Sequence, residues 1–356
     1  MTKIVFEHCI FLHQTIGGIS KYICKINKAF QNSDIKSTIY SPISINDNLK
    51  ISENNNIVYF KFKKIPIFFT KIFYFINNLA TIIFINFYKP DIIHFTYYNN
   101  FLYKFISTPY VLTIYDLINE KKRHSEKKFK KNELIKKASH IICISKETKK
   151  NLIKFYNINK KKISVIYLGT EKNIPLIVKK KNYILFVGSR FGYKNFLNFI
   201  KAYSKSEYLV KNYKVLCFGS ENFDSNEIQL FNKLKIQNNI IFKTGNDKIL
   251  ERIYRNASLF LSTSKQEGFG LTPLEAMRCG CPTLCSNIPV FKEILGNSCE
   301  YTNPYKINDI KSKMEKILKS KIKQKTLIKH GFLKTQQFSW EKCSSETINV
   351  YKKILN

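Results

Sequence analysis

The chain has 356 residues, of which 44% are hydrophobic, and its formal net charge is +35 at pH 7. This length suits two domains with a core each. Lysine supplies nearly all of the positive charge, because only five residues are arginine. Recognition of nucleic acids favours arginine forks and basic motifs interleaved with aromatic residues, which this chain lacks, so we expect no nucleic-acid partner. The nine cysteines lack the spacing of a zinc site and indicate a reducing, cytoplasmic environment.

The N-terminal half opens with a short strand at residues 3–6 and then a glycine turn. Gly17 and Gly18 stand at the start of a helix that runs to Phe30, and strands follow at residues 37–41 and 57–62. Such a turn either admits a ligand or packs a helix against a sheet. It lacks the G-x-G-x-x-G spacing of dinucleotide folds, so by itself it is a weak signal.

Residues 65–88 form a long apolar and aromatic stretch that is nearly long enough to span a bilayer. Lys71, Asn77, Asn78 and Asn86 interrupt it, and such residues are costly in lipid. We expect an amphipathic helix that either covers the sheet or docks on a membrane surface.

Four further segments of the first half are rich in β-branched and aromatic residues, as is typical of parallel strands buried on both faces. They are residues 91–97, 110–116, 138–145 and 163–168. Tyr115 and Asp116 end the second of these strands, and Asp116 either binds a hydroxyl group or caps a turn. Ser145 is expected to cap the helix that follows it.

The second half begins again with strand, glycine and helix. Residues 183–187 form the strand, Gly188 ends it, and Arg190 and Lys194 follow in a short loop. Two cations beside a helix start at the carboxyl edge of a sheet are the outline of a diphosphate clamp. The alternative for either cation is an ion pair within the protein.

The most informative stretch runs from Ser264 to Met277, after a buried strand at residues 259–263. Its glycines permit positive φ and a close approach to a ligand, and Pro273 fits the first turn of a helix. Glu267 lies in the loop and Glu275 follows eight residues later in the helix. Open α/β sheets bind ligands at this edge, so the two carboxylates are candidate ligand groups.

Strands and helices alternate throughout, which predicts an α/β protein with one parallel sheet in each half. We place the domains at residues 1–170 and 171–337, with a terminal helix at 338–356 that Ser339 caps and Trp340 anchors. Residues 169–181, polar and rich in lysine, are the expected linker, and residues 121–137 are an expected helix.

The stretch around Glu267 and Glu275 resembles the E-x7-E signature of retaining glycosyltransferases of family 4, also called glycosyl transferases group 1. The segments around Gly17, Tyr115 and Arg190 are similar to family segments as well. The resemblance implies the GT-B fold, in which two Rossmann-like parallel-sheet domains face each other across a cleft and the last helix returns to the first domain.

The resemblance also implies roles for particular residues. The catalytic candidates are Glu267, Arg190 and Lys194. The donor-binding candidates are Glu275, Gly268, Phe269, Gly270, Leu271 and Gly188. The candidates on the acceptor or cleft side are Gly17, Gly18, Tyr115 and Asp116. Many members have a histidine near the reacting sugar where this chain has Tyr115, so it stays open whether Tyr115 replaces it.

The expected activity is transfer of a hexose, with mannose among the candidates, from a nucleotide-diphosphate sugar to a glycan or lipid-linked acceptor. The resemblance implies no metal and no other cofactor, and no D-x-D triplet is present. It also implies no protein base, because the departing phosphate is thought to take the acceptor's proton. We expect a cytoplasmic protein, in one interpretation at the cytoplasmic face of an anionic membrane.

Two other classes of protein compete with this interpretation. One is a catalytically inactive protein that binds a membrane surface or a polyanion on the same fold. The other is a dinucleotide oxidoreductase, which the missing G-x-G-x-x-G disfavours.

Overall fold

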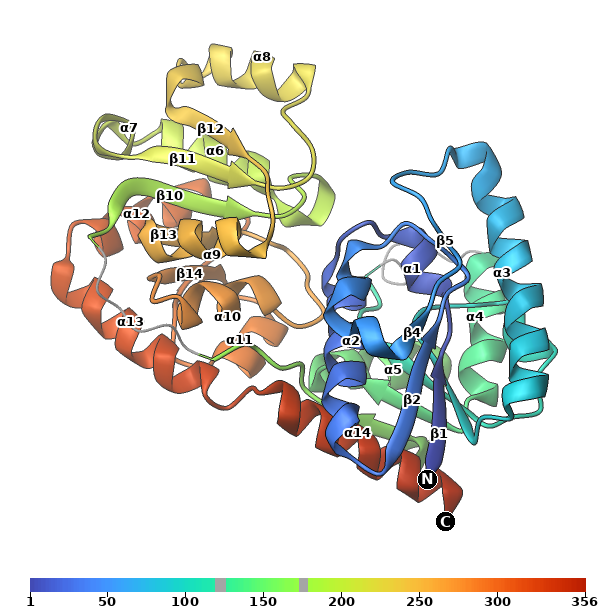
Figure 1. The fold of residues 1–356 in the computed structure, drawn as a ribbon. Helices are drawn as coiled ribbons and strands as arrows, with labels where there is room; N and C mark the ends of the chain where they lie inside the picture. The colour runs from blue at the N-terminus through green and yellow to red at the C-terminus, as the bar shows by residue number, and fades with distance from the viewer. Residues whose placement is uncertain (119–125, 173–178) are drawn as a thin grey trace. The chain divides into compact units, whose positions relative to one another are not determined.

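The computed structural model describes residues 1–118, 126–172 and 179–356 (Figure 1). These residues form two compact units. Unit 1 comprises Met1–Gly169 and Ser339–Asn356, and unit 2 comprises Thr170–Phe338. The expected α/β class with two parallel sheets is confirmed, and each unit is described by itself below.

Unit 1 is built on a seven-stranded sheet in the order β4-β2-β1-β6-β7-β8-β9. Every pairing in it is parallel. Its strands are β1 (Thr2–Phe6), β2 (Ile35–Tyr40), β4 (Asn56–Ile57), β6 (Ile92–Phe95), β7 (Tyr110–Ile114), β8 (His140–Cys143) and β9 (Ile163–Val165). The carboxyl ends of these strands therefore share one edge of the sheet, where the loops after β1 and β7 lie.

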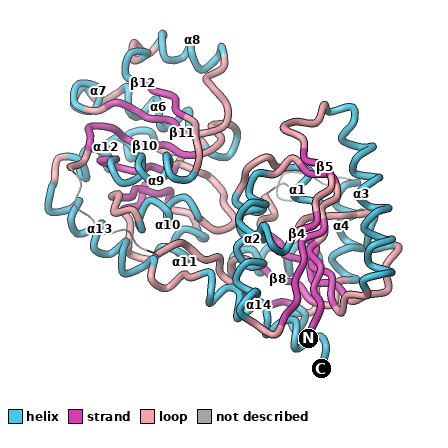
Figure 2. Tube along the Cα trace, in the orientation of Figure 1, coloured by secondary structure: helices cyan, strands magenta, loops and turns pink. Residues whose placement is uncertain are grey.

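Helices cover the sheet of unit 1, and Figure 2 shows them in cyan around the magenta strands. They are α1 (Cys9–His13), α2 (Gly18–Ala29), α3 (Ile67–Tyr88), α4 (Glu126–Lys137), α5 (Lys146–Tyr156) and α14 (Trp340–Leu355). The C-terminal helix α14 is tied to the sheet by Tyr351, whose hydroxyl lies 2.5 Å from His94 Nδ1 in β6. Ser145 and Ser339 cap α5 and α14 as predicted, because each side chain accepts a backbone N–H three residues on.

The expected strand at residues 57–62 is wrong, because it is split into β4 and β5 (Phe60–Lys61), and β5 pairs with β3 (Ile43–Ser44) instead of the main sheet. The amides of Tyr59 and Phe60 both bind Pro42 O, which turns the chain away from β2. Residues 121–125 of the expected helix and 173–178 of the expected linker lie outside the described residues.

Unit 2 is a doubly wound sheet in the order β12-β11-β10-β13-β14-β15, with every pairing parallel. Its strands are β10 (Lys181–Val187), β11 (Lys214–Phe218), β12 (Ile240–Lys243), β13 (Ala257–Ser262), β14 (Thr283–Ser286) and β15 (Glu300–Thr302). The strand order reverses between β10 and β13. In such sheets ligands bind outside the carboxyl ends of the strands at this switch point.

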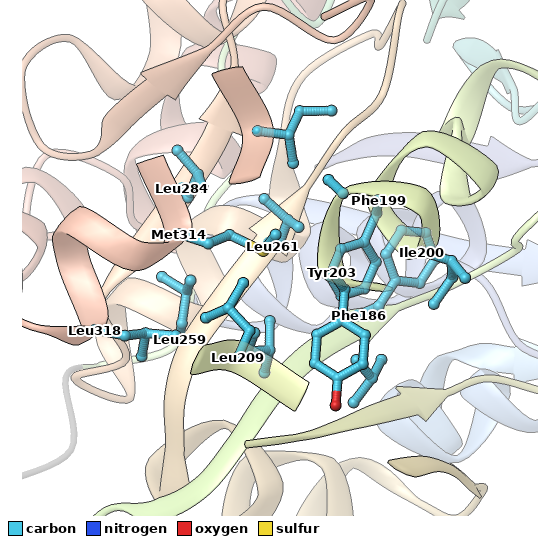
Figure 3. Packing of buried hydrophobic residues seen from close by; sticks show 14 of the residues in the cluster. Phe186, Phe199, Ile200, Tyr203, Leu209, Leu259, Leu261, Leu284, Met314 and Leu318 are labelled. Atoms are coloured by element: carbon cyan, nitrogen blue, oxygen red, sulfur yellow. The ribbon is translucent and has the colours of Figure 1, made fainter. Parts of the chain in front are cut away.

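The core of unit 2 follows from the two-residue period of its strands. Phe186, Leu259 and Leu261 face one side of the sheet and pack on α6 and α12, as the close-up of this cluster shows (Figure 3). Leu185 and Phe260 point to the other side, among residues of α9 and α10. The helices are α6 (Phe196–Ser204), α7 (Glu207–Asn212), α8 (Ser225–Lys233), α9 (Asp247–Asn256), α10 (Leu271–Arg278), α11 (Pro289–Leu295), α12 (Ile307–Leu318) and α13 (Lys321–Thr335). This packing fixes the strand ends that carry the candidate site.

Candidate active site

The loop after β10 is shaped by glycine. Gly188 has φ +105°, which favours glycine, and a side chain added to it would point into open space. The amide of Gly188 still donates to Phe218 O, so β10 stays paired with β11 up to this corner. A short 3₁₀ turn, Gly192–Lys194, then leads to Asn195, which has φ +60° and precedes α6.

The loop after β10 is joined to the loop after β13 by several hydrogen bonds. The amide of Lys265 donates to Tyr193 O at 2.7 Å, and Asn195 Nδ2 donates to Thr263 O at 3.1 Å. Thr263 Oγ1 donates in return to Lys194 O at 3.2 Å. Because these bonds are made by backbone and buried groups, they fix the position of one loop against the other at the switch point.

The joined loops place Lys194 against Glu267. Lys194 Nζ lies 2.7 Å from Glu267 Oε1, and the side chains are 22% and 16% exposed. Ser264 Oγ donates to the same oxygen at 2.7 Å. Within the described residues Glu267 Oε2 accepts no hydrogen bond, so one carboxylate oxygen remains for a ligand. Lys194 and Glu267 thus place a positive and a negative charge side by side at the edge where open sheets bind ligands.

The turn between Glu267 and α10 depends on Gly270. Its φ is +120°, and an added Cβ would lie 3.1 Å from Phe291 Cε1. Leu271 begins α10, and Gly268 and Leu271 are half-buried. Phe269 is different, because its ring is buried and packs edge to face on Phe338 with ring centroids 5.9 Å apart. The structure thus gives the predicted donor-binding residue Phe269 a packing role for its side chain.

Glu275 lies half-buried on α10 beside Tyr254 of α9. The hydroxyl of Tyr254 donates to Glu275 Oε2 at 3.5 Å. Burial, followed by the negative charge of Glu275, raises the pKa of Tyr254 well above its ordinary value, so this tyrosine stays a neutral donor. The second glutamate of the sequence motif is therefore oriented by a neighbouring helix.

Arg190 is engaged away from Lys194 and Glu267. Its guanidinium contacts Glu227 of α8 through Nε at 2.6 Å and Nη2 at 2.9 Å, and it donates to the carbonyls of Glu221 and Asn222. The Arg190 side chain is only 3% exposed. Four donated bonds leave only one N–H of the five, so Arg190 cannot hold a phosphate through two N–H groups in this arrangement. A phosphate role for Arg190 requires the guanidinium to leave these partners, and it stays a prediction.

The predicted residues of unit 1 lie after the carboxyl ends of β1 and β7. Gly17 and Gly18 start α2, and Gly17 O accepts from Asn48 Nδ2 at 3.0 Å. Asp116 is half-buried and its Oδ1 accepts the amide of Ile118, as a turn cap does. Tyr115 is buried, its ring packs edge to face against Tyr22 of α2, and burial raises the pKa of its hydroxyl. The structure therefore places Tyr115 in the interior of unit 1.

Two residues that hold the site together were given no role from the sequence. Asn195 follows Lys194 and binds both the β13 loop and Pro304 O, the latter at 2.7 Å. Ser264 orients Glu267. An asparagine between a cation and a helix is a recognisable signal, because asparagine tolerates positive φ, whereas nothing in the sequence marks Ser264. In the described part of the chain, no three histidine, cysteine or acidic side chains gather as a metal site would need.

Comparison with family models identifies both halves of the chain. The model described as glycosyl transferases group 1 matches residues 169–334, and the model described as glycosyltransferase family 4 matches residues 16–173. The O-antigen chain mannosyltransferase RfbU of Salmonella typhimurium is 33% identical over 175 residues, which is 48% of this chain and 48% of that protein. The O-antigen chain mannosyltransferase B of Escherichia coli is 25% identical over 246 residues, 65% of this chain and 64% of that protein. The chain thus matches about half to two thirds of these relatives.

Solved structures share the fold over nearly the whole chain. A sucrose-phosphate synthase from Thermosynechococcus elongatus has a TM-score of 0.81 at 16% identity and covers 99% of both chains. The HepE protein of Anabaena, solved with UDP and glucose, has a TM-score of 0.78 at 15% identity, over 99% of this chain and 100% of that one.

Proposed function

Because the chain belongs to the family of glycosyl transferases group 1 and has the GT-B fold, we propose that it transfers a hexose from a nucleotide-diphosphate sugar to a glycan or lipid-linked acceptor, with retention of configuration. One observation carries this proposal. Lys194 and Glu267 meet at 2.7 Å at the switch point of unit 2, where this sheet type binds its ligands.

In the proposed reaction the bond between the sugar and the diphosphate breaks, and a bond from the same sugar carbon to an acceptor hydroxyl forms on the same face. Negative charge builds on the departing diphosphate. The Lys194 ammonium is placed to stabilise that charge, together with the backbone N–H groups that begin α10, and this electrostatic contribution is commonly the largest in catalysis. The departing phosphate takes the acceptor proton, so no protein base is assigned.

The two glutamates take different parts of the donor in this proposal. Glu267 Oε2 accepts a hydroxyl of the transferred sugar, while Ser264 holds the carboxylate through Oε1. Glu275 accepts the ribose hydroxyls of the nucleotide, since a carboxylate can accept two hydroxyl groups at once. Unit 2 is thus the donor-binding unit and unit 1 the acceptor-binding unit.

Mannose is the proposed hexose, on the support of the two O-antigen mannosyltransferases to which the chain is similar. A thermal-shift screen of nucleotide sugars identifies the donor, and the proposal expects a GDP- or UDP-linked hexose to raise the melting temperature. NMR of the product then gives the anomeric configuration. Failure of every nucleotide sugar to stabilise the protein contradicts the proposal.

Three substitutions test the assigned roles. Glu275→Ala is expected to raise the donor KM with little change in kcat, whereas Glu267→Gln and Lys194→Met lower kcat. Lys211→Met is the matched control, because Lys211 is an exposed lysine in α7 of the same unit. Donor turnover at the wild-type rate in all three site variants contradicts the assignment.

The proposal includes a reaction without metal and a cytoplasmic site of action. Turnover that continues in EDTA and is not raised by Mg²⁺ or Mn²⁺ supports the first part, and loss of turnover in EDTA contradicts it. The second part rests on the nine cysteines, all of which are free and buried.

A catalytically inactive membrane-binding protein is the second candidate, and the exposed apolar face of α3 favours it. Vesicle binding without hydrolysis or transfer from any nucleotide sugar would identify that candidate.

A further inference from the structure

Helix α3 of unit 1 exposes an apolar face and buries polar side chains, unlike most surface helices. Three of its polar side chains, Asn77, Asn78 and Thr81, are fully buried in the unit, whereas Lys71 and Asn86 are exposed. Ile85 packs into the core, but a stripe of apolar side chains points outward and is 43% to 85% exposed, namely Phe68, Ile72, Phe75, Leu79, Ile83 and Phe87. These residues recur every three or four positions, so they share one helix face.

The buried polar face explains why α3 is held with this orientation. Asn77 binds both the N–H and the C=O of Ile43, at 2.9 and 2.8 Å. Asn78 Oδ1 accepts from Asn99 at 2.9 Å, and Thr81 Oγ1 lies 3.1 Å from His8 Nδ1. Rotating the helix to bury its apolar stripe would break these bonds and leave buried polar groups unpaired, which is costly.

Continuous aromatic contacts widen the apolar surface beyond α3. Phe62, after β5, stacks on Phe73 with ring centroids 5.5 Å apart. On another side Phe75 packs edge to face on Phe101, which in turn contacts Phe105, itself 57% exposed. Figure 1 shows α3 along the flank of unit 1, with the sheet on one side of it. Contiguous exposed apolar surface of this kind marks an interaction site.

The charge around the surface indicates what covers it. From Tyr59 to Phe105 the sequence has six lysines and a single carboxylate, Asp91. That carboxylate already accepts the amide of Lys3 at 2.7 Å. Lys63, Lys64 and Lys71 are exposed at the start of the helix, and Lys104 is exposed near Phe105. A lysine-flanked aromatic and aliphatic face matches the interface of a bilayer with anionic headgroups, where lysine stems lie along apolar surface while their charges stay in water.

We propose that the outward face of α3 seats the protein on anionic phospholipid, with the helix lying in the membrane interface. By length and composition α3 could also cross a bilayer, since an 18-residue window within Phe68–Tyr88 has a mean hydropathy of 1.6. Crossing would, however, pull Asn77 and Asn78 out of unit 1 into hydrocarbon. The interfacial position keeps every bond of the buried face. It needs no sugar donor, so it goes beyond the proposed reaction and can fail separately from it.

The test is flotation of the full chain with vesicles of phosphatidylglycerol and phosphatidylcholine, beside vesicles of phosphatidylcholine alone. Wild type is expected to float with the anionic vesicles, to bind the neutral ones at least about tenfold more weakly, and to be released by high salt. Equal binding to both vesicle types, or retention after a high-salt wash, overturns the proposal.

Paired variants assign the binding to this face. Phe68→Ser, Phe75→Ser and Phe87→Ser together are expected to reduce binding at least about tenfold, because each removes an apolar side chain from the interface. The matched control is Ile228→Ser, Ile322→Ser and Leu333→Ser, which removes side chains of unit 2 that are 48%, 81% and 55% exposed. Equal loss in both triple variants overturns the proposal.

A second copy of the chain is the competing occupant of this face. Sedimentation velocity without lipid is expected to show a monomer for wild type and for the α3 variant. Self-association of wild type that the α3 variant abolishes, with no flotation, overturns the proposal. Hydrolysis of a water-soluble nucleotide sugar is expected to be unchanged in the α3 variant, which separates this surface from the reaction.

Discussion

Asn195 should control how firmly the two loops of the candidate active site are joined, although it takes no part in the proposed reaction. It has φ +60°, it is buried, and its Nδ2 donates to Thr263 O at 3.1 Å and to Pro304 O at 2.7 Å. Asn195→Ala removes both bonds and places a Cβ-bearing residue with no local hydrogen bond in the left-handed region. Asn195→Gly removes the same bonds but accepts that backbone without strain.

The magnitudes follow from these contacts. Loss of the bond to Thr263 leaves a buried carbonyl unpaired and costs about 1.5 kcal/mol. Loss of the bond to Pro304 costs about 0.5 kcal/mol, because Asn198 Nδ2 still donates to that carbonyl at 3.0 Å. The left-handed backbone adds about 1 kcal/mol for alanine. Asn195→Ala should therefore weaken the joined loops by about 3 kcal/mol and Asn195→Gly by about 2 kcal/mol.

Hydrogen exchange measures this effect locally. The amide of Lys265 donates across the joined loops to Tyr193 O, so its protection reports their opening. Its exchange should accelerate roughly 100-fold in Asn195→Ala, since each 1.4 kcal/mol is a factor of ten, and less in Asn195→Gly. Asn198→Ala is the control, because Asn198 donates to Pro304 O but not to Thr263 O. Unchanged exchange in Asn195→Ala, or equal acceleration in Asn198→Ala, would refute this reasoning.

Three further predictions concern the reaction, the turn and the response to acid. Lys194→Met should lower kcat about 100-fold, measured as donor turnover, as loss of one stabilising group for developing charge does. Gly270→Ala should destabilise unit 2 by about 2 kcal/mol, measured by urea unfolding, because alanine at φ +120° also presses its Cβ on Phe291. His94 is fully buried, and burial lowers its pKa from 6.5 to about 3. Its neutral form stabilises the fold fully above pH 6.5, and that stability is lost as pH falls, by roughly 2 kcal/mol at pH 5. His94→Gln should flatten the pH dependence of unfolding, and His330→Gln, at an exposed position in α13, is the matched control.

Much of the fold follows from local sequence signals. Residues 183–187, for example, combine β-branched and aromatic side chains and are followed by a glycine, and they lie in the parallel strand β10. Ser145 and Ser339 precede helices in the pattern of N-caps and act as such. The neighbourhood of Lys194 and Glu267 also follows, because both come after carboxyl ends of strands that turned out to be adjacent.

Other features depend on contacts that the sequence does not encode locally. The carboxylate that binds Arg190 is Glu227, 37 residues away in α8. The hydropathy of residues 65–88 predicts an amphipathic helix but not which face is buried, and only the partners of Asn77 and Asn78 decide that. The split of the expected strand at residues 57–62 likewise depends on Pro42 O, which captures two amides from another segment.

The two cations of the β10 loop differ in how readily they can meet a ligand. Lys194 is bound to Glu267 by one partly exposed ion pair, and such pairs are worth about 1 kcal/mol, so a diphosphate can take over the ammonium at little cost. The Arg190 side chain is nearly inaccessible, and it donates two hydrogen bonds to Glu227. Its guanidinium carbon lies 4.9 Å from the ring centroid of Phe223. Breaking such a buried pair costs about 3 kcal/mol or more.

This difference gives opposite expectations for the two cations. Arg190→Met should lower the stability of unit 2 by about 3 kcal/mol, because it leaves the Glu227 carboxylate without its partner. Urea unfolding measures that loss, and Arg190→Met with Glu227→Leu should recover most of it, because the unpaired charge is gone. Lys194→Met should instead lower kcat while stability changes by less than about 1 kcal/mol. If Arg190→Met lowers kcat at unchanged stability, the guanidinium does leave Glu227 for the donor, and the diphosphate clamp expected from the sequence is the better description of this loop.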